Sequence, residues 1–243
     1  MAISTAHIVR KRIEKMQPGE VFAYSSFNLD KSEDLSLAKS LSRLSKEGAI
    51  VRLAKGKYYK PKDTYFGRLR PSESALIEAL TKRNNERVGY LTGISIYNRL
   101  GLTSQISNTI VIATSRPLPP KLLEGYKVKY VKREFDIRDQ DIPLLQILDA
   151  TRYIKSIPDT SPEEALKILI SKIKELSNEN RTQLVKLALN YNAATRSLLG
   201  AIMQKYMPQT SVSRLADSLN ILSTYEIGLS ESVLPNKSDW KIR

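Results

Sequence analysis

The sequence has no cysteine and only one histidine among its 243 residues. Without cysteine there is no disulfide framework, no thiolate zinc site and no cysteine nucleophile. The one histidine, His7, lies in a basic segment without a second metal ligand at suitable spacing, which predicts an ordinary surface or capping residue. No GxxxxGK[ST] phosphate loop occurs, and the two glycines of GYLTG (89–93) predict a strand-to-helix turn instead. We therefore expect no catalytic residues, no cofactor, no metal site and no enzymatic activity.

Long apolar runs are also missing. No segment approaches the roughly 18 apolar residues that a membrane-spanning helix needs. Arg10, Lys11 and Arg12 occupy the place where a signal peptide would have its apolar core. The content of 41% hydrophobic and 26% charged residues is that of an ordinary globular protein, long enough for one large domain or two small ones. These features predict a soluble cytoplasmic protein that does not bind membranes.

The charge is strongly and unevenly positive. The net charge is +14, and the sequence pI is about 9.8. Residues 1–62 contain 13 Lys or Arg against six Asp or Glu, so a quarter of the chain carries half of the excess. This distribution predicts a polyanionic partner that meets the N-terminal segment.

The N-terminal pattern predicts a winged helix-turn-helix. A short helix over residues 5–16 precedes Pro18-Gly19, a short extended piece and a weakly indicated turn at residues 25–29. A clearer helix follows, with leucines at positions 37, 41 and 44 and an end at Gly48. Residues 49–53 and 58–60 then read as the two strands of a hairpin around Lys55-Gly56-Lys57, in which Gly56 permits the turn. This order of elements is that of a winged helix with a basic wing.

The residues predicted to contact DNA belong to the second helix and the hairpin. Small hydroxyl residues and cations recur on the helix face opposite the leucines, and this face carries no carboxylate, so it can approach phosphates and guanine edges. The predicted contacts are Ser36, Lys39, Ser40, Arg43, Lys46, Arg52, Lys55 and Lys57. Two alternatives stay open, namely a winged helix that docks a protein and a basic face that is merely solvated. Of Tyr58 and Tyr59, we expect at least one to pack in the core rather than to stack on bases.

The rest of the chain predicts an α+β fold, with a mixed α/β middle region and a mostly helical C-terminal region. Residues 60–71 read as a linker, so we expect a winged-helix domain at 1–62 and a second domain at 71–243, with a further boundary near 140 left open. Helices are expected at 72–83, 94–100, 142–154, 181–191, 193–206 and 212–223, with strands at 87–91, 108–113 and 126–131. Ser161-Pro162-Glu163-Glu164 predicts a capping box that starts another helix.

Four aspartates, at positions 136, 139, 141 and 149, lie close together in the sequence. Such a cluster can bind magnesium, but we interpret it as a solvated loop and helix start.

The stretch KSLSRLSKEGAIVRLAKGKYYKP (39–61) resembles the N-terminal winged-helix domain of AbiEi-type antitoxins, in which a string A-L-x-R-L-x-x-x-G-x-I-x-R-x-x-x-G-x-Y-x-x-P recurs. This sequence places Ser40 where the string has Ala. It then matches at Leu41, Arg43, Leu44, Gly48, Ile50, Arg52, Gly56, Tyr58 and Pro61. GYLTGISIYNRLGLTSQISNTIVIATSRPLP (89–119) is similar to the start of the antitoxin domain in the same family. The resemblance covers roughly residues 5–135, and the helical part from 142 onward lies outside it.

The resemblance implies two tasks. The winged helix would bind double-stranded DNA at repeats in its own promoter and repress the operon of a toxin–antitoxin system used in abortive infection and phage defence. The second domain would counteract a cognate nucleotidyltransferase-type toxin, without a stable complex being required. A transcription regulator with a C-terminal ligand-binding or dimerisation domain is the alternative, and an enzyme that works with carboxylates is a third, less favoured reading.

Overall fold

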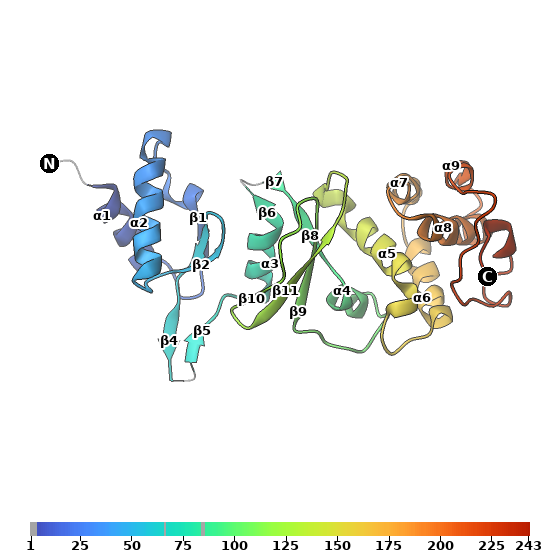
Figure 1. The fold of residues 1–243 in the computed structure, drawn as a ribbon, viewed down its shortest axis with the longest axis horizontal. Helices are drawn as coiled ribbons and strands as arrows, with labels where there is room; N and C mark the ends of the chain where they lie inside the picture. Colours follow the sequence, from blue (N-terminus) through green and yellow to red (C-terminus); the bar gives the residue numbers. More distant parts are fainter. Residues whose placement is uncertain (1–3, 66, 84–85) are drawn as a thin grey trace. The chain divides into compact units, whose positions relative to one another are not determined.

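The structure is a computed structural model that describes residues 4–65, 67–83 and 86–243. It has the α+β class expected from the sequence (Figure 1). The chain divides into two compact units, one formed by residues 1–89 with 120–128, the other by residues 90–119 with 129–243. The predicted domain limits at residues 62 and 71 both fall within the first of these units.

The first unit begins with two α-helices, two 3-10 turns and a small sheet. The helices are α1 (Thr5–Lys15), a 3-10 turn η1 (Tyr24–Phe27), a second turn η2 (Lys31–Glu33) and α2 (Asp34–Lys46). The strands are β1 (Val21–Ala23), β2 (Val51–Ala54) and β3 (Lys57–Tyr59), paired antiparallel in the order β1-β3-β2. This is the order of elements that the sequence predicts for residues 5–60.

The two long helices pack through the apolar stripes that their sequences contain. The hydroxyl of Ser4 caps α1 by accepting a hydrogen bond from the backbone of His7, and α1 buries Val9 and Ile13. The cluster around them consists of Val9, Ile13, Met16, Phe22, Phe27, Leu37, Leu41, Leu44, Ile50 and Tyr58. Because α2 turns its leucines inward, its opposite face is left to solvent.

The segment predicted as a linker is instead a hairpin. β4 (Lys62–Thr64) pairs with β5 (Gly67–Leu69), and Asp63 accepts a hydrogen bond from Arg68 at 3.2 Å. Its described residues are all exposed. The hairpin therefore lacks the apolar alternation by which a strand is recognised in a sequence.

The remainder of the first unit holds one helix and two further hairpin pieces. α3 (Glu73–Thr81) is capped by Ser72, and β6 (Lys82–Arg83) pairs with β7 (Glu86–Arg87). β10 (Lys121–Leu123) and the start of β11 (Tyr126–Lys132) come from much later in the chain. The Lys121 ammonium donates to the Leu53 carbonyl at 3.1 Å, and the Tyr59 hydroxyl donates to Glu124 at 2.6 Å.

The second unit combines strands with a helical bundle. Its elements include β8 (Gly89–Thr92), α4 (Ile94–Arg99) and β9 (Thr109–Thr114), and β9 lies between β8 and β11 in the sheet. Gly93 has φ +79° between β8 and α4, which confirms the strand-to-helix turn predicted at 89–93. The helices are α5 (Ile142–Arg152), α6 (Pro162–Lys174), α7 (Asn178–Ala188), α8 (Ala193–Tyr206) and α9 (Ser213–Asp217), with 3-10 turns η3 (Asp139–Asp141), η4 (Ile154–Ser156) and η5 (Ser238–Trp240).

In the helical region, the structure confirms the predicted capping box but not the predicted length of the last helix. The Ser161 hydroxyl accepts from the Glu164 backbone at 3.2 Å, and the Glu164 carboxylate accepts from the Ser161 backbone at 2.9 Å, which is the predicted capping box. The helix expected at 212–223 is wrong in length, because α9 ends at Asp217. The C-terminal segment is largely irregular and is held by Trp240, whose indole donates to Gln204 at 2.6 Å. Among the helices that the structure describes, none is long and apolar enough to cross a membrane.

Candidate nucleic-acid interface

The exposed face of α2 carries three of the predicted contact cations. Lys39, Arg43 and Lys46 follow one another at i, i+4 and i+7, and all three are exposed. Ser36 is also exposed at the start of this face. Since Leu37, Leu41 and Leu44 are buried on the other side, the helix presents its cations away from its own core.

The carboxylate of Glu47 lies at the end of this face, which we expected to carry no carboxylate. Glu47 lies 3.7 Å from the Arg43 guanidinium and 3.1 Å from that of Arg10. The Arg43 side chain remains 63% exposed, so the pair is a solvent-screened surface contact. Glu47 thus weakens the positive potential at Arg43 without covering it.

Ser40 is not a surface residue, and its prediction as a DNA contact is wrong. Its side chain is only 9% exposed, and its hydroxyl donates to the Ser36 carbonyl at 2.8 Å. Position 40 follows Leu37 by three residues and precedes Leu44 by four, so the helical period places it beside the buried stripe. The short side chain fits there because its hydroxyl finds a backbone acceptor.

The hairpin β2–β3 places only part of its predicted contacts at the surface. Lys55 is exposed in the turn, where Gly56 has φ +72°, and Arg52 is exposed with its Nε 3.4 Å from the Ala54 carbonyl. The prediction that Lys57 contacts DNA at the hairpin tip is wrong. Its ammonium is half-buried and donates to the Lys82 carbonyl at 2.8 Å.

The electrostatics of Lys57 follow from this position. Burial lowers the pKa of the Lys57 ammonium, the carboxylate of Glu78 opposes that shift, and the cations Lys82 and Arg87 add to it. A cation that is directed into the unit cannot also reach a phosphate outside it. Of the eight predicted DNA contacts, six are therefore exposed, namely Ser36, Lys39, Arg43, Lys46, Arg52 and Lys55.

The tyrosines at the end of the hairpin pack in the interior. Tyr58 is 3% exposed and stacks with its ring 6.0 Å from Phe22, and Tyr59 is fully buried. Burial and the hydrogen bond to Glu124 raise the pKa of Tyr59. The expectation that at least one tyrosine packs is confirmed, and neither presents its ring for stacking on a base.

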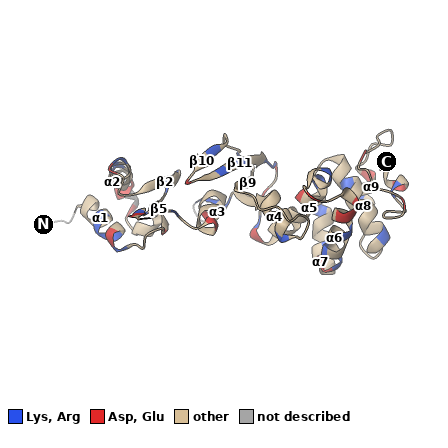
Figure 2. Ribbon diagram, turned by 90° about the horizontal axis from the view of Figure 1, so that it is seen from below, with Lys and Arg blue, Asp and Glu red and all other residues tan. Residues whose placement is uncertain are grey.

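Other cations of the first unit were not singled out from the sequence as nucleic-acid contacts. Figure 2 shows Lys and Arg along α1 as well as α2. Lys62, Arg68 and Arg70 are exposed on and beside the hairpin β4–β5. No periodic pattern marks these residues, so only the structure identifies them as surface cations.

His7 is exposed at the start of α1, as expected.

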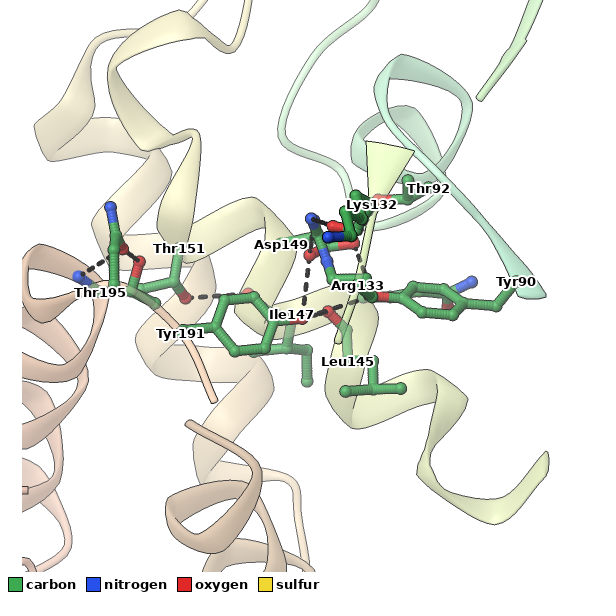
Figure 3. Close-up of polar contacts among 12 residues, drawn as sticks. Tyr90, Thr92, Lys132, Arg133, Leu145, Ile147, Asp149, Thr151, Tyr191 and Thr195 are labelled. Atoms are coloured by element: carbon green, nitrogen blue, oxygen red, sulfur yellow. Dashed lines mark hydrogen bonds and ion pairs between the residues drawn. The ribbon is translucent and has the colours of Figure 1, made fainter. Parts of the chain in front are cut away.

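Two of the four aspartates, Asp136 and Asp139, are exposed as expected, whereas Asp141 and Asp149 are buried, and Asp149 lies at the centre of a hydrogen-bonded network (Figure 3). Asp149 has no exposed surface and accepts from the Arg133 guanidinium at 2.5 Å. Three hydroxyls also donate to its carboxylate, those of Thr92 at 2.7 Å, Tyr191 at 2.9 Å and Tyr90 at 3.0 Å. Asp141 is buried too, with Gln183 as donor at 3.1 Å. The prediction of a solvated acidic segment is thus wrong for these two residues.

The network contains a buried ion pair between Arg133 and Asp149, and the Nε of Arg133 has no hydrogen-bond partner among the described residues. Burial opposes the charge on Arg133, but the adjacent Asp149 outweighs it, and the pKa of Arg133 is raised. Burial and the carboxylate of Asp149 likewise raise the pKa values of Tyr90 and Tyr191. Within the described residues, no three His, Asp or Glu side chains are grouped as metal ligands. The carboxylate accepts from four donors and joins α5 to β8, to Arg133 directly after β11 and to the segment after α7.

Comparison with solved structures gives a distant likeness in fold. The chain is similar to the crystal structure of the RV2827C protein from Mycobacterium tuberculosis, at 14% sequence identity and a TM-score of 0.50. The match covers 93% of this chain and 85% of that one. No curated protein matches the chain.

A family model matches residues 8–133, which is more than half of the chain. This range contains α1, α2 and the hairpin β2–β3, and it continues through β11. The family is described only as a family of unknown function, DUF6088. The chain belongs to the DUF6088 family.

Proposed function

We propose that this protein is an antitoxin-like, DNA-binding autorepressor. The exposed face of α2 binds double-stranded DNA in the protein's own promoter, at repeat sites, and the hairpin β2–β3 meets the phosphate backbone beside it. The observation that carries this proposal is the row of Lys39, Arg43 and Lys46 on the exposed face of α2. A helix face of this kind, next to a hairpin with Arg52 and Lys55, supports DNA binding in the winged-helix manner.

The second part of the proposal rests on the resemblance to AbiEi-type antitoxins. The remainder of the chain counteracts a nucleotidyltransferase-type toxin in the cytoplasm and does so without catalysis of its own. The environment of Asp149 supports this reading, because a carboxylate with four donors is held in place rather than poised for chemistry. A transcription regulator with a C-terminal ligand-binding or dimerisation domain is the alternative.

DNA binding is tested by fluorescence anisotropy with the duplex upstream of the gene and a scrambled duplex, at two salt concentrations. Arg43→Ala weakens specific binding by about 1–3 kcal/mol if Arg43 reads a base edge. Glu47→Gln has the opposite effect on affinity and tightens DNA binding, since it removes the carboxylate beside Arg43. Lys186→Ala, an exposed lysine of α7, is the matched control and leaves affinity unchanged. Equal affinity of wild type for both duplexes, or an Arg43→Ala variant with full affinity, would contradict the DNA-reading role.

The antitoxin role is tested separately by co-expression with the neighbouring gene. If a nucleotidyltransferase-like toxin is encoded there, growth is restored by this protein and also by its Arg43→Ala variant. This expectation follows because α2 serves only the DNA. Specific promoter binding without any rescue of growth would leave the alternative regulator as the function.

A further inference from the structure

The flank of α1 that faces away from the α2 ion pair borders an open groove in the first unit. The groove has a volume of about 750 Å³ and is lined by α1 and Met16 together with Glu20, with Ser26 of η1 and with Asn28. Its main residues are His7, Ile8, Lys11, Arg12, Lys15 and Met16. Lys11, Arg12 and Lys15 are exposed, Ile8 is half-buried and Met16 is buried, so cations surround an apolar floor.

The cations of this groove are not neutralised. Among the residues that the structure describes, no carboxylate forms an ion pair with Lys11, Arg12 or Lys15. Glu20 is the one acidic residue of the lining, and its carboxylate is already engaged by the backbone N–H of Gln17 at 2.8 Å. With three cations against one carboxylate, the lining of the groove has a net positive charge.

The groove is a surface distinct from the proposed DNA-binding face. One residue advances the direction of a side chain by about 100° around a helix. From buried Val9, Arg10 lies about 100° to one side and makes the ion pair with Glu47 at the end of α2. Lys15 lies about 120° to the other side, so the groove cations are on the opposite flank of α1.

We infer that this groove binds an acidic amphipathic helix of a partner protein. Charge complementarity selects an acidic ligand, because three free cations and a histidine line the rim. The apolar floor selects a ligand that also brings apolar side chains, which a DNA backbone does not. A helix with apolar residues on one face and carboxylates beside them satisfies both conditions. This inference goes beyond the proposed function, since it concerns neither α2 nor the promoter.

The test uses the full chain and fluorescence anisotropy with three labelled peptides of equal length, about four helical turns. The first places leucines on one helix face and glutamates elsewhere, the second has the same composition in scrambled order, and the third is polyglutamate. We expect the first peptide to bind at least about tenfold more tightly than the other two. Equal binding of all three, or none, would overturn the inference.

Two charge-reversal variants locate the binding. Lys11→Glu/Lys15→Glu loses at least about tenfold in affinity for the amphipathic peptide. Lys39→Glu/Lys46→Glu changes the net charge of the same unit equally and keeps the affinity within about twofold. Because all four residues are exposed, both variants keep the fold, which circular dichroism verifies. Equal losses in both variants would mean attraction by bulk charge. Loss of promoter binding in the first variant but not in the second would assign the groove to DNA and refute the inference.

Discussion

The ion pair between Arg133 and Asp149 permits a prediction with a defined magnitude. The Asp149→Asn substitution keeps the shape of the side chain and leaves an oxygen for the hydroxyls of Tyr90 and Thr92. It removes the counter-charge of a guanidinium that is only 5% exposed. Breaking a buried pair by removing one charge costs about 3–5 kcal/mol, which is a large share of the stability of a domain.

The matching substitution is Arg133→Met, which removes the cation and keeps most of the buried chain length. It leaves the Asp149 carboxylate with three hydroxyl donors, so its cost lies at the lower end of the same range. In the double variant no charge remains buried, and the asparagine oxygen still accepts hydrogen bonds. We therefore expect the double variant to be more stable than the sum of the two single losses predicts, by about 1–3 kcal/mol.

The measurement is equilibrium unfolding in urea, followed by tryptophan fluorescence. Trp240 is the only tryptophan of the sequence, and its buried side chain lies in the second unit with the network. With a urea dependence of about 2–3 kcal/mol per molar, each single variant lowers the midpoint by about 1–2.5 M. Single losses below about 1 kcal/mol, or strictly additive losses in the double variant, would refute the view that the pair is desolvated and coupled.

Three other predictions concern packing, capping and pH. Gly200→Ala puts a methyl group into the ring of Trp240 and destabilises the second unit by about 1–3 kcal/mol despite the better helix propensity of alanine, as measured by urea unfolding. Ser161→Ala removes the capping box with Glu164 and costs about 1 kcal/mol, whereas Ser161→Asp retains the cap and most of the stability, a contrast that thermal melting detects. The buried phenols make stability fall as the pH rises above about 10, the usual tyrosine pKa, because the folded state holds them neutral while the unfolded chain ionises them. The phenols with raised pKa are Tyr59, Tyr90, Tyr97 and Tyr191, and urea midpoints that stay constant above pH 10 would contradict their burial.

The sequence predicted those elements whose signals are local. The leucines of α2 recur at the helical period, and Ser161 with Glu164 forms a complete capping box, so both helices were expected from nearby residues alone. β4–β5 was missed because its described residues are exposed and carry no alternation. Ser40 was placed on the wrong side because it was grouped with the polar residues by type, although its spacing from Leu37 and Leu44 puts it at the edge of the apolar stripe.

The candidate site was predictable in its location but not in its details. The acceptor of Lys57 is a carbonyl 25 residues further along, and the donors to Asp149 are 16 to 59 residues away from it. Partners at such separations are brought together only by tertiary packing, and no spacing rule identifies them. The charge of the N-terminal segment was therefore a sound guide to a basic surface, but only the fold shows which cations are free to act.

The salt dependence of DNA binding shows how many of the exposed cations contact phosphates. Each phosphate that a cation neutralises contributes about 0.9 to the slope of log affinity against log salt concentration. If the DNA meets only Lys39, Arg43, Lys46, Arg52 and Lys55, the slope per chain is at most about 4–5. If the three cations of the α1 groove also contacted phosphates, the slope would approach about 7. A slope near the higher value that falls by about two in Lys11→Glu/Lys15→Glu would show one continuous DNA surface, and the separation of the two faces on α1 and α2 would then be wrong.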